Sequence, residues 1–571
     1  MSSSNSVIGS LNSRIYSDIR GVDYSDKEIN ISRSPDMLNM WRNYANLGKS
    51  IETRPEIEKI INTNENVYGI FFYRVNNVDH FIVHSGTSLY DYNFDTNVLN
   101  CIKQNGMNPR RSFSFIYNNI LYIKDGINYL EYNGVKVSEV VGYIPTTSIS
   151  KAPSGGGTVH EEYNILTGLR KNSFVADGTS TIYDCDVESF TSSNVKVWIN
   201  DVEVSTGFTV NPTNGTVVFD SPPDVPLSDG QDNVIIQFES IISGDRDIIN
   251  KCTLLTVFDN RVFFSGNQDY PSTIFPCMLD NPRYVTRGDF YQEGLDLSPV
   301  KAMVAGNNSL WVFKEPSQSN TTVFYHTPVI DTEQGKCYPS NHSSISIGCV
   351  STGINFNDDI IFFSNRGMEG INGDVTTEQV LAHRSSLVDA KLLKESNYKN
   401  LILEEWRGYL LVIVGSHIYL ADSQALFTNK THNEYEWFYW ELSKSVICTV
   451  VKDDVLYIGT SDGIYSLTDT NASVNSYVCT TKDVCGYPQL NKSTNKKGFT
   501  IDFTGKNVSL AVRTDDTNFE TIGIFQNTKD YIVPVVKKKK WRNIQFKISS
   551  SSRFSFYRLN FEFFVGSYIK R

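Results

Sequence analysis

One stretch of this chain has the residues of a catalytic serine, but its surroundings are wrong for that role. Residues 459–463, GTSDG, match the Gly-x-Ser-x-Gly pattern. In enzymes that pattern places the serine on a sharp turn from a strand into a helix, so a helix must follow it. Here IYSL follows, and its β-branched and aromatic residues favour a strand. We therefore predict a hairpin turn at this position.

A second stretch ends like a phosphate-binding loop. Gly48-Lys49-Ser50 are the closing residues of that motif, which also needs a glycine five residues before Gly48. That position is Asn43, and no apolar strand precedes it. We therefore expect no nucleotide site here.

The histidines do not have the spacing of a metal site. His80 and His84 lie four apart on a predicted strand and so share one face, but no acidic residue or cysteine nearby completes a ligand set. His160 is followed by two glutamates but lacks the second histidine of a zinc-protease helix. The paired carboxylates of a glycan hydrolase are not identifiable either. We expect no catalytic, cofactor-binding or metal residues, and no enzyme.

Lys537 to Lys540, followed by Trp541 and Arg542, form the strongest charge cluster of the chain. One interpretation is a solvated turn between two strands. The other is a contact with an acidic partner surface or with nucleic-acid phosphates. No base-stacking aromatic residues are interleaved with the lysines, which argues against reading of a base sequence.

The composition limits the class of protein. The chain has 571 residues, 40% of them hydrophobic and 12% aromatic, and a net charge of −11. An acidic balance argues against a protein that wraps DNA. The sequence shows no apolar run long enough to span a membrane and no signal peptide at its start. Nine scattered cysteines without a Cys-x-x-Cys pair indicate reduced, mostly buried thiols and synthesis in a reducing cytoplasm.

The strands predicted from the sequence follow a repeated strand–turn–strand pattern. Several segments read as an apolar strand, a polar turn and a second apolar strand, and four continue into a third strand with a tyrosine. These tyrosines are Tyr90, Tyr129, Tyr419 and Tyr465. The first turns lie near Asn77, Asn118, Asp259, Asn307, Asn357, Arg407 and Asp453, at steps of 41, 141, 48, 50, 50 and 46 residues. Steps of about 40–50 residues are typical of propeller blades. The alternative is a set of β-meanders without ring closure.

One step is too long for a single blade, and it contains a different pattern. A Pro-, Ser- and Gly-rich linker ends at Gly157, and alternating strands follow with turns at Asn200-Asp201 and Asn214-Gly215. We predict an all-β protein: a β-propeller of six to eight blades over 61–145 and 243–470, an inserted β-sandwich over 146–242, and a C-terminal β-sandwich-like domain over 471–571.

Residues 1–60 remain as an N-terminal lead-in. Ser34 is a good helix N-cap, Pro35 a good first helical residue, and Asp36 favours the positive end of a helix. This pattern predicts a short capped helix from Pro35 to about Tyr44. We also expect Asp36, Asn39 and Arg54 to pin the lead-in through hydrogen bonds or an ion pair.

The lead-in resembles the N-terminus of tail nozzle, or packaged-DNA-stabilisation, proteins of short-tailed double-stranded DNA bacteriophages. The matching residues are Gly21, Val22, Asp23, Ser34, Pro35, Asp36, Asn39, Gly48, Arg54 and Pro55, while Glu56 replaces a usual glycine. The segments EEYNILTGLRKNSF…VKVWINDVEV and KKWRNIQFKISS are similar to the insertion and the closing β-segment of such proteins.

The resemblance implies a virion structural protein, assembled in the host bacterial cytoplasm as a six-membered ring in the tail. Such a ring continues the portal and adaptor channel, contacts other tail proteins, retains packaged DNA and lets it exit without sequence-specific binding. The alternative is a host-surface adhesin of a phage tail, with the inserted and C-terminal domains as receptor-facing modules.

Overall fold

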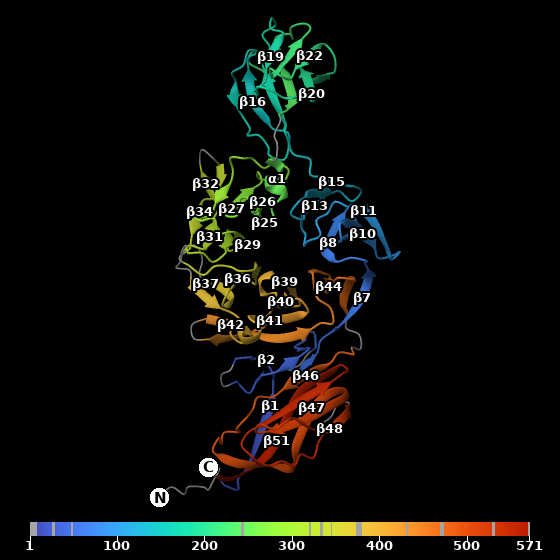
Figure 1. The fold of residues 1–571 in the computed structure, drawn as a ribbon, viewed down its shortest axis with the longest axis vertical. Helices are drawn as coiled ribbons and strands as arrows, with labels where there is room; N and C mark the ends of the chain where they lie inside the picture. The colour runs from blue at the N-terminus through green and yellow to red at the C-terminus, as the bar shows by residue number, and fades with distance from the viewer. Residues whose placement is uncertain are drawn as a thin grey trace. The chain divides into compact units, whose positions relative to one another are not determined.

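A computed structural model describes residues 8–25, 29–46, 50–240, 245–318, 321–331, 335–343, 345–372, 380–429, 432–468, 473–527 and 532–568. The chain divides into two compact units, the first comprising Met1–Ile70 with Ile347–Arg571 and the second Phe71–Ser346. Figure 1 shows the strands along the chain, coloured from the N- to the C-terminus.

The protein is all-β and is built on a β-propeller. Within the described residues, seven four-stranded antiparallel sheets have the strand order of blades. The first three are β8–β11 (Val67–Val75, Val78–Ser85, Ser88–Asn93, Val98–Lys103), β12–β15 (Phe113–Tyr117, Ile120–Lys124, Tyr129–Tyr132, Val137–Glu139) and β25–β28 (Leu254–Phe258, Arg261–Ser265, Thr273–Pro276, Tyr291–Gln292). The fourth combines β29, β30, β31 and β34 (Val300–Gly306, Ser309–Lys314, Val323–His326, Ser340–His342).

The last three blades belong to the first unit. They are β35–β38 (Gly353–Phe356, Asp359–Ser364, Gly367–Asn372, Val380–His383), β39–β42 (Ile402–Trp406, Tyr409–Val414, His417–Asn429, His432–Glu441), and β43–β45 (Cys448–Lys452, Val455–Gly459, Gly463–Thr468) with β7 (Glu56–Asn62). Strand β7 pairs with β45, so a strand from the N-terminal part completes the final blade and covers its edge.

The seven predicted first turns are confirmed, and the backbone shows why. At each of them two consecutive residues have positive φ, as at Asn76 and Asn77 (49° and 62°) and at Asp453 and Asp454 (50° and 64°). Such two-residue turns match the twist of antiparallel strands, and Asn, Asp and Gly adopt positive φ at the lowest cost. The GTSDG segment is also the predicted hairpin turn, between β44 and β45.

The inserted β-sandwich has two sheets around its own core. Strands β16, β17, β18, β20, β21 and β24 form one sheet (Thr146–Lys151, Thr158–Val159, Leu169–Phe174, Thr191–Ile199, Val202–Val204, Val234–Glu239). Strands β19, β22 and β23 form the other (Ile182–Asp184, Phe208–Asn211, Thr216–Phe219). Phe174, Tyr183 and Phe219 pack between them. The expected boundary at residue 242 lies outside the described residues.

Besides a two-stranded sheet of the lead-in, five short elements of the described residues lie outside these sheets and the C-terminal domain. Two are helices of the blade connections, α1 (Asp245–Asn250) and α2 (Asp389–Leu392). The others are a 3-10 turn, η1 (Tyr398–Asn400), and the hairpin of β32 (Val329–Asp331) and β33 (Gly335–Cys337).

The C-terminal domain is one ten-stranded sheet to which the N-terminal segment contributes. Its C-terminal strands are β46 (Ser476–Cys479), β47 (Leu490–Thr514), β48 (Glu520–Asn527), β49 (Lys539–Trp541), β50 (Ile544–Ser550) and β51 (Phe554–Tyr568). Strands β1 (Leu11–Ser17), β4 (Met37–Leu38), β5 (Met40–Trp41) and β6 (Ile51–Thr53) join them. Figure 1 shows β1 alongside β51, with which it pairs over seven residues. The domain therefore needs residues from both ends of the chain.

The predicted helix from Pro35 to Tyr44 is wrong. The segment instead forms β4 and β5, preceded by β3 (Arg33–Ser34), which pairs with β2 (Gly21–Val22). Asn39 stands between β4 and β5 with φ of 56°, a left-handed conformation that interrupts a right-handed helix. Long-range pairing of Met37 and Leu38 with β46 therefore overrides the local helix signal.

Candidate functional site

Five lead-in residues singled out in the sequence converge on a largely buried polar cluster in the first unit, here called the N-terminal anchor. It comprises Gly21, Ser34, Asp36, Asn39 and Arg54 with their partners on β42 and β46. Strands β2, β4 and β5 all pack against β42, the outer strand of its blade. The anchor therefore joins three segments that are far apart in sequence: the lead-in, a propeller blade and the first strand of the C-terminal region.

Asn39 is the centre of the anchor. Its Oδ1 accepts hydrogen bonds from Arg54 Nε at 3.0 Å and from the backbone N–H of Glu441 at 2.8 Å. Its Nδ2 donates to the carbonyl of Asn475 at 2.9 Å, and its backbone N–H donates to the carbonyl of Tyr439 at 3.0 Å. With its backbone in a left-handed conformation, Asn39 alone forms hydrogen bonds to both the blade and the C-terminal region.

Arg54 is 5% exposed and donates to neutral acceptors. Besides Asn39, its guanidinium donates to the carbonyl of Pro55 at 2.7 Å and to that of Glu441 at 3.1 Å. Burial lowers the pKa of Arg54 to about 10. Because this pKa is still well above neutral pH, the side chain remains charged there. The guanidinium thus holds the end of β42 by charge-assisted hydrogen bonds.

Ser34 and Asp36 fix the turn that leads into β4. Ser34 is fully buried, its hydroxyl donates to the Asp36 carbonyl at 2.8 Å, and it accepts from the Asp36 N–H at 3.3 Å. Tyr477 donates to the Asp36 carboxylate at 2.9 Å, and the N–H of Cys479 donates to the Asp36 carbonyl. Pro35 is half-buried between them. The serine acts here as a turn residue and not as a helix cap.

The Gly-Val-Asp start has a steric explanation. A Cβ on Gly21 would lie 2.1 Å from the carbonyl oxygen of Trp437, so only glycine allows β2 to lie this close to β42. Val22 is fully buried, and the N–H of Asp23 donates to the Ser34 carbonyl at 2.8 Å. Gly48 of the same pattern lies outside the described residues.

Two contributions to the anchor were not predicted from sequence. Arg33 makes a bidentate ion pair with Glu436, with both distances 2.8 Å and the Glu436 side chain 1% exposed. Trp41 packs against Trp406 and Trp440 at centroid distances of 5.3 and 5.6 Å. Only the charge of Arg33 and the apolar character of Trp41 were visible in the sequence, because their partners lie about 400 residues away.

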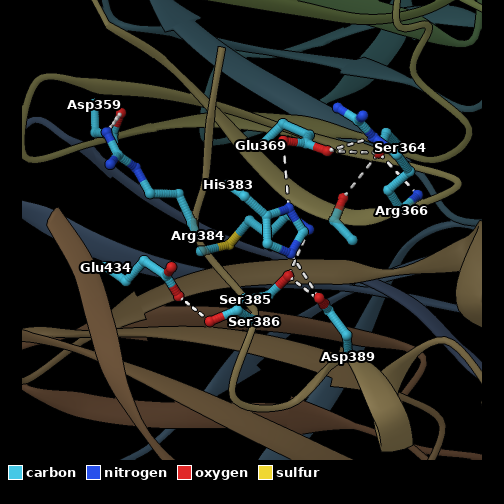
Figure 2. Close-up of polar contacts among 12 residues, drawn as sticks. Asp359, Ser364, Arg366, Glu369, His383, Arg384, Ser385, Ser386, Asp389 and Glu434 are labelled. Carbon is cyan, nitrogen blue, oxygen red and sulfur yellow. Dashed lines mark hydrogen bonds and ion pairs between the residues drawn. The ribbon is translucent and has the colours of Figure 1, made fainter. Parts of the chain in front are cut away.

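A second polar cluster joins β37, the end of β38 and the connection that follows it, and Figure 2 shows it. His383 stands between two carboxylates, with Nε2 2.6 Å from Asp389 and Nδ1 3.4 Å from Glu369. Burial alone would lower the pKa of His383, but the hydrogen bonds to Asp389 and Glu369 outweigh it and raise this pKa to about 10. His383 is therefore a cation at neutral pH, held by two anions.

The hydroxyls around His383 are already used as donors to acidic groups. Ser385 donates to Asp389 at 2.6 Å, and Ser364 donates to Glu369 at 3.2 Å. A protonated histidine between carboxylates is not a base that activates a serine. This geometry favours a structural ion network over nucleophilic chemistry.

The histidines singled out in the sequence have ordinary partners in the second unit. His80 is 2.5 Å from Asp91, and the fully buried His84 contacts the Ser112 hydroxyl at 2.9 Å. Among the described residues, no group of three or more histidines, cysteines and acids is arranged to hold a metal ion. In the same part of the chain, no helix is long and apolar enough to cross a membrane.

The second unit contains a cavity of about 860 Å³. Three tyrosines line it, Tyr284, Tyr291 and Tyr338, and Arg261 and Asp289 lie among them. Arg261 is 8% exposed, forms an ion pair with Asp289 at 3.3 Å, and stacks 5.0 Å from the Tyr338 ring centroid. Aromatic rings with a few convergent polar groups are the usual lining of a ligand pocket.

Comparisons with known proteins show no family model and no curated protein that matches this chain. Solved structures to which this chain is similar include BamB from Moraxella catarrhalis (10% identity, 72% of this chain and 96% of that chain, TM-score 0.33). Others are the dihydro-heme d1 dehydrogenase NirN in complex with DHE (10% identity, 91% and 82%, TM-score 0.31) and BBS1N in complex with ARL6DN (8% identity, 74% and 98%, TM-score 0.26). Likeness at this level carries no argument about function.

Proposed function

We propose that this chain is a virion structural protein of a short-tailed bacteriophage, a subunit of the tail nozzle ring. In this role it would be assembled in the host cytoplasm, join the tail as one of six copies, and contact the portal or adaptor. Packaged DNA would be retained by the ring and would pass through it on infection.

The observation that carries the proposal is the N-terminal anchor. The lead-in pattern that resembles the N-terminus of nozzle proteins contains residues that, in isolation, have no evident reason to occur together. In the structure Gly21, Asn39 and Arg54 act on the same blade strand, β42. The pattern is therefore explained as one mechanical joint.

Such a joint suits a wall that bears load. The anchor ties the lead-in to a blade and to the C-terminal sheet through buried, charge-assisted hydrogen bonds, which are stronger than neutral ones. Seven blades with tight turns and long-range strand pairing add rigidity. The overall net charge of −11 disfavours adhesion of the genome over most of the protein surface.

Quantitative mass spectrometry of purified phage particles from the source host tests the proposal. We expect this chain at a fixed copy number, about half that of the portal protein. Absence from the particles would overturn the nozzle assignment.

A second candidate function is host-surface binding, and the tyrosine-lined cavity favours it. Tyrosine rings with an arginine–aspartate pair offer a stacking face and hydrogen-bonding groups to a surface saccharide. Binding of the purified protein to host cells, weakened by Tyr291→Ala but not by substitution of the exposed Tyr568, would support this function. Absence of cell binding by the intact protein would contradict it.

A further inference from the structure

Three of the four consecutive lysines of the C-terminal region, Lys537–Lys539, lie beside two lysines that are distant in sequence, Lys496 and Lys497. Thr494 on β47 exchanges hydrogen bonds with Lys538, and Ser493 is paired with Lys539. This register places residues 496–497, which lie where the pairing of β47 with β51 is irregular, beside residues 537–539. The result is a surface pocket of about 440 Å³ whose lining includes Lys496, Lys497, Lys537, Lys538 and Lys539, with Ser493, Thr494, Asn495 and Phe564.

The pocket has an excess of positive charge in an acidic protein. None of the nine described lining residues is acidic. Two acids lie at its edge: Glu520 forms an ion pair with Lys538, and Glu562 accepts a hydrogen bond from Asn495 at 2.7 Å. Four lysines of the pocket stay exposed, so their mutual repulsion is relieved by a mobile counterion or by a bound anion.

We propose that this pocket is a binding site for the phosphate backbone of DNA. Lysines at positions i and i+2 of an extended segment, such as Lys537 and Lys539, stand about 6.6 Å apart and present a row of charges. A row of positive charges of this kind suits a DNA strand, which carries one negative phosphate charge per nucleotide. Lysine is a point charge without the planar fork of arginine, which suits contacts independent of base sequence.

A protein partner fits this surface less well. Lysine is depleted from the cores of protein–protein interfaces, which favour aromatic residues, methionine and arginine. Phe564, 40% exposed, is the single aromatic ring in the described lining, so base stacking is not the main contact. The inference goes beyond the proposed function, because DNA binding by the purified chain is measured whether or not the chain is found in particles.

The test uses the full-length protein and a fluorescein-labelled DNA duplex, with the Kd measured by anisotropy from 50 to 200 mM NaCl. The variant carries Lys496→Gln, Lys497→Gln, Lys537→Gln and Lys539→Gln. Its control carries the same change at four other solvent-accessible lysines: Lys103, Lys136, Lys394 and Lys399. Both variants have the same net charge, so only the location of the charge differs.

We expect salt-sensitive binding by the unmodified protein and the control. In the pocket variant, the slope of log Kd against log salt concentration falls by about 3 to 4, because each removed lysine leaves about one phosphate without its partner charge. Replacement of the same four residues by arginine retains binding, and the melting temperatures show that each protein is folded. No binding at 50 mM NaCl, or equally weakened binding in both glutamine variants, overturns the proposal. Competition by polyglutamate of equal charge that matches unlabelled DNA would assign the pocket to an acidic protein instead.

Discussion

Arg54 Nε lies 3.0 Å from Asn39 Oδ1, and both side chains are almost completely buried. The two residues stand on different short strands or turns of the lead-in, and each also bonds Glu441 at the end of a propeller strand. This pair is therefore the point at which the N-terminal segment is fixed to the blade.

Replacing Arg54 with Ala should lower the melting temperature of the first unit by several degrees. The substitution removes three charge-assisted hydrogen bonds and leaves buried carbonyls without a donor, a cost on the order of 2–3 kcal/mol. Differential scanning calorimetry measures the effect. Arg542→Ala, at a half-exposed arginine of the same unit, is the control, and equal melting temperatures for both variants would contradict the role of Arg54.

Gly21→Ala should destabilise the same unit by about 1–3 kcal/mol, since the new methyl group would meet the Trp437 carbonyl at 2.1 Å and force β2 from β42. Gly486→Ala is the control: its φ of +77° strains the backbone, but nothing lies within 4 Å of the added carbon. Chemical denaturation followed by tryptophan fluorescence compares them. A smaller effect at Gly21 than at Gly486 would show that the close approach is not required.

His383 should make stability fall on the alkaline side. The folded-state pKa of about 10 lies above the usual value of 6.5, so the folded state binds the proton more tightly. The stabilisation is complete below pH 6.5 and is lost as the pH rises through about 10. Melting curves of the unmodified protein and His383→Gln should therefore differ most near pH 6 and converge at about pH 10.5. A difference in melting temperature that does not depend on pH would contradict an ionised His383. As the control, His342→Gln, at an exposed histidine, should leave the melting curves at both pH values unchanged.

In the second unit, His84 should make stability fall on the acidic side instead. Burial lowers the pKa of His84 to about 4, so the folded state holds it neutral while the unfolded state takes up a proton below pH 6.5. Its contribution to stability is present above pH 6.5 and is lost as the pH falls towards 4. His84→Gln should flatten this acid dependence even if it lowers stability at neutral pH. An unchanged slope between pH 6.5 and 4 would show that other groups cause the acid destabilisation.

The blades were predictable from the sequence because their determinants are local. A hairpin needs two alternating strands and a turn whose residues tolerate positive φ, and Asn118-Asn119 or Asp453-Asp454 supply that within a few residues. The long step between blades likewise predicted the inserted sandwich, since its own strands and turns are consecutive in the chain.

The anchor could be predicted only in part. The sequence indicated that Asp36, Asn39 and Arg54 would form hydrogen bonds, but it could not identify β42 and β46 as the partners. The local preference of Ser34, Pro35 and Asp36 for a helix start was outweighed by pairing with strands more than 400 residues away.

The sequence by itself determined the repeated hairpins, the insertion and the all-β character, because turn chemistry and strand alternation act over neighbouring residues. The tertiary structure alone decided that the lead-in completes both the last blade and the C-terminal sheet, and that Lys496 and Lys497 join Lys537–Lys539. Two- and three-residue strands such as β5 and β6 have too few residues to show a period. Their conformation comes from the hydrogen bonds and burial that distant partners supply.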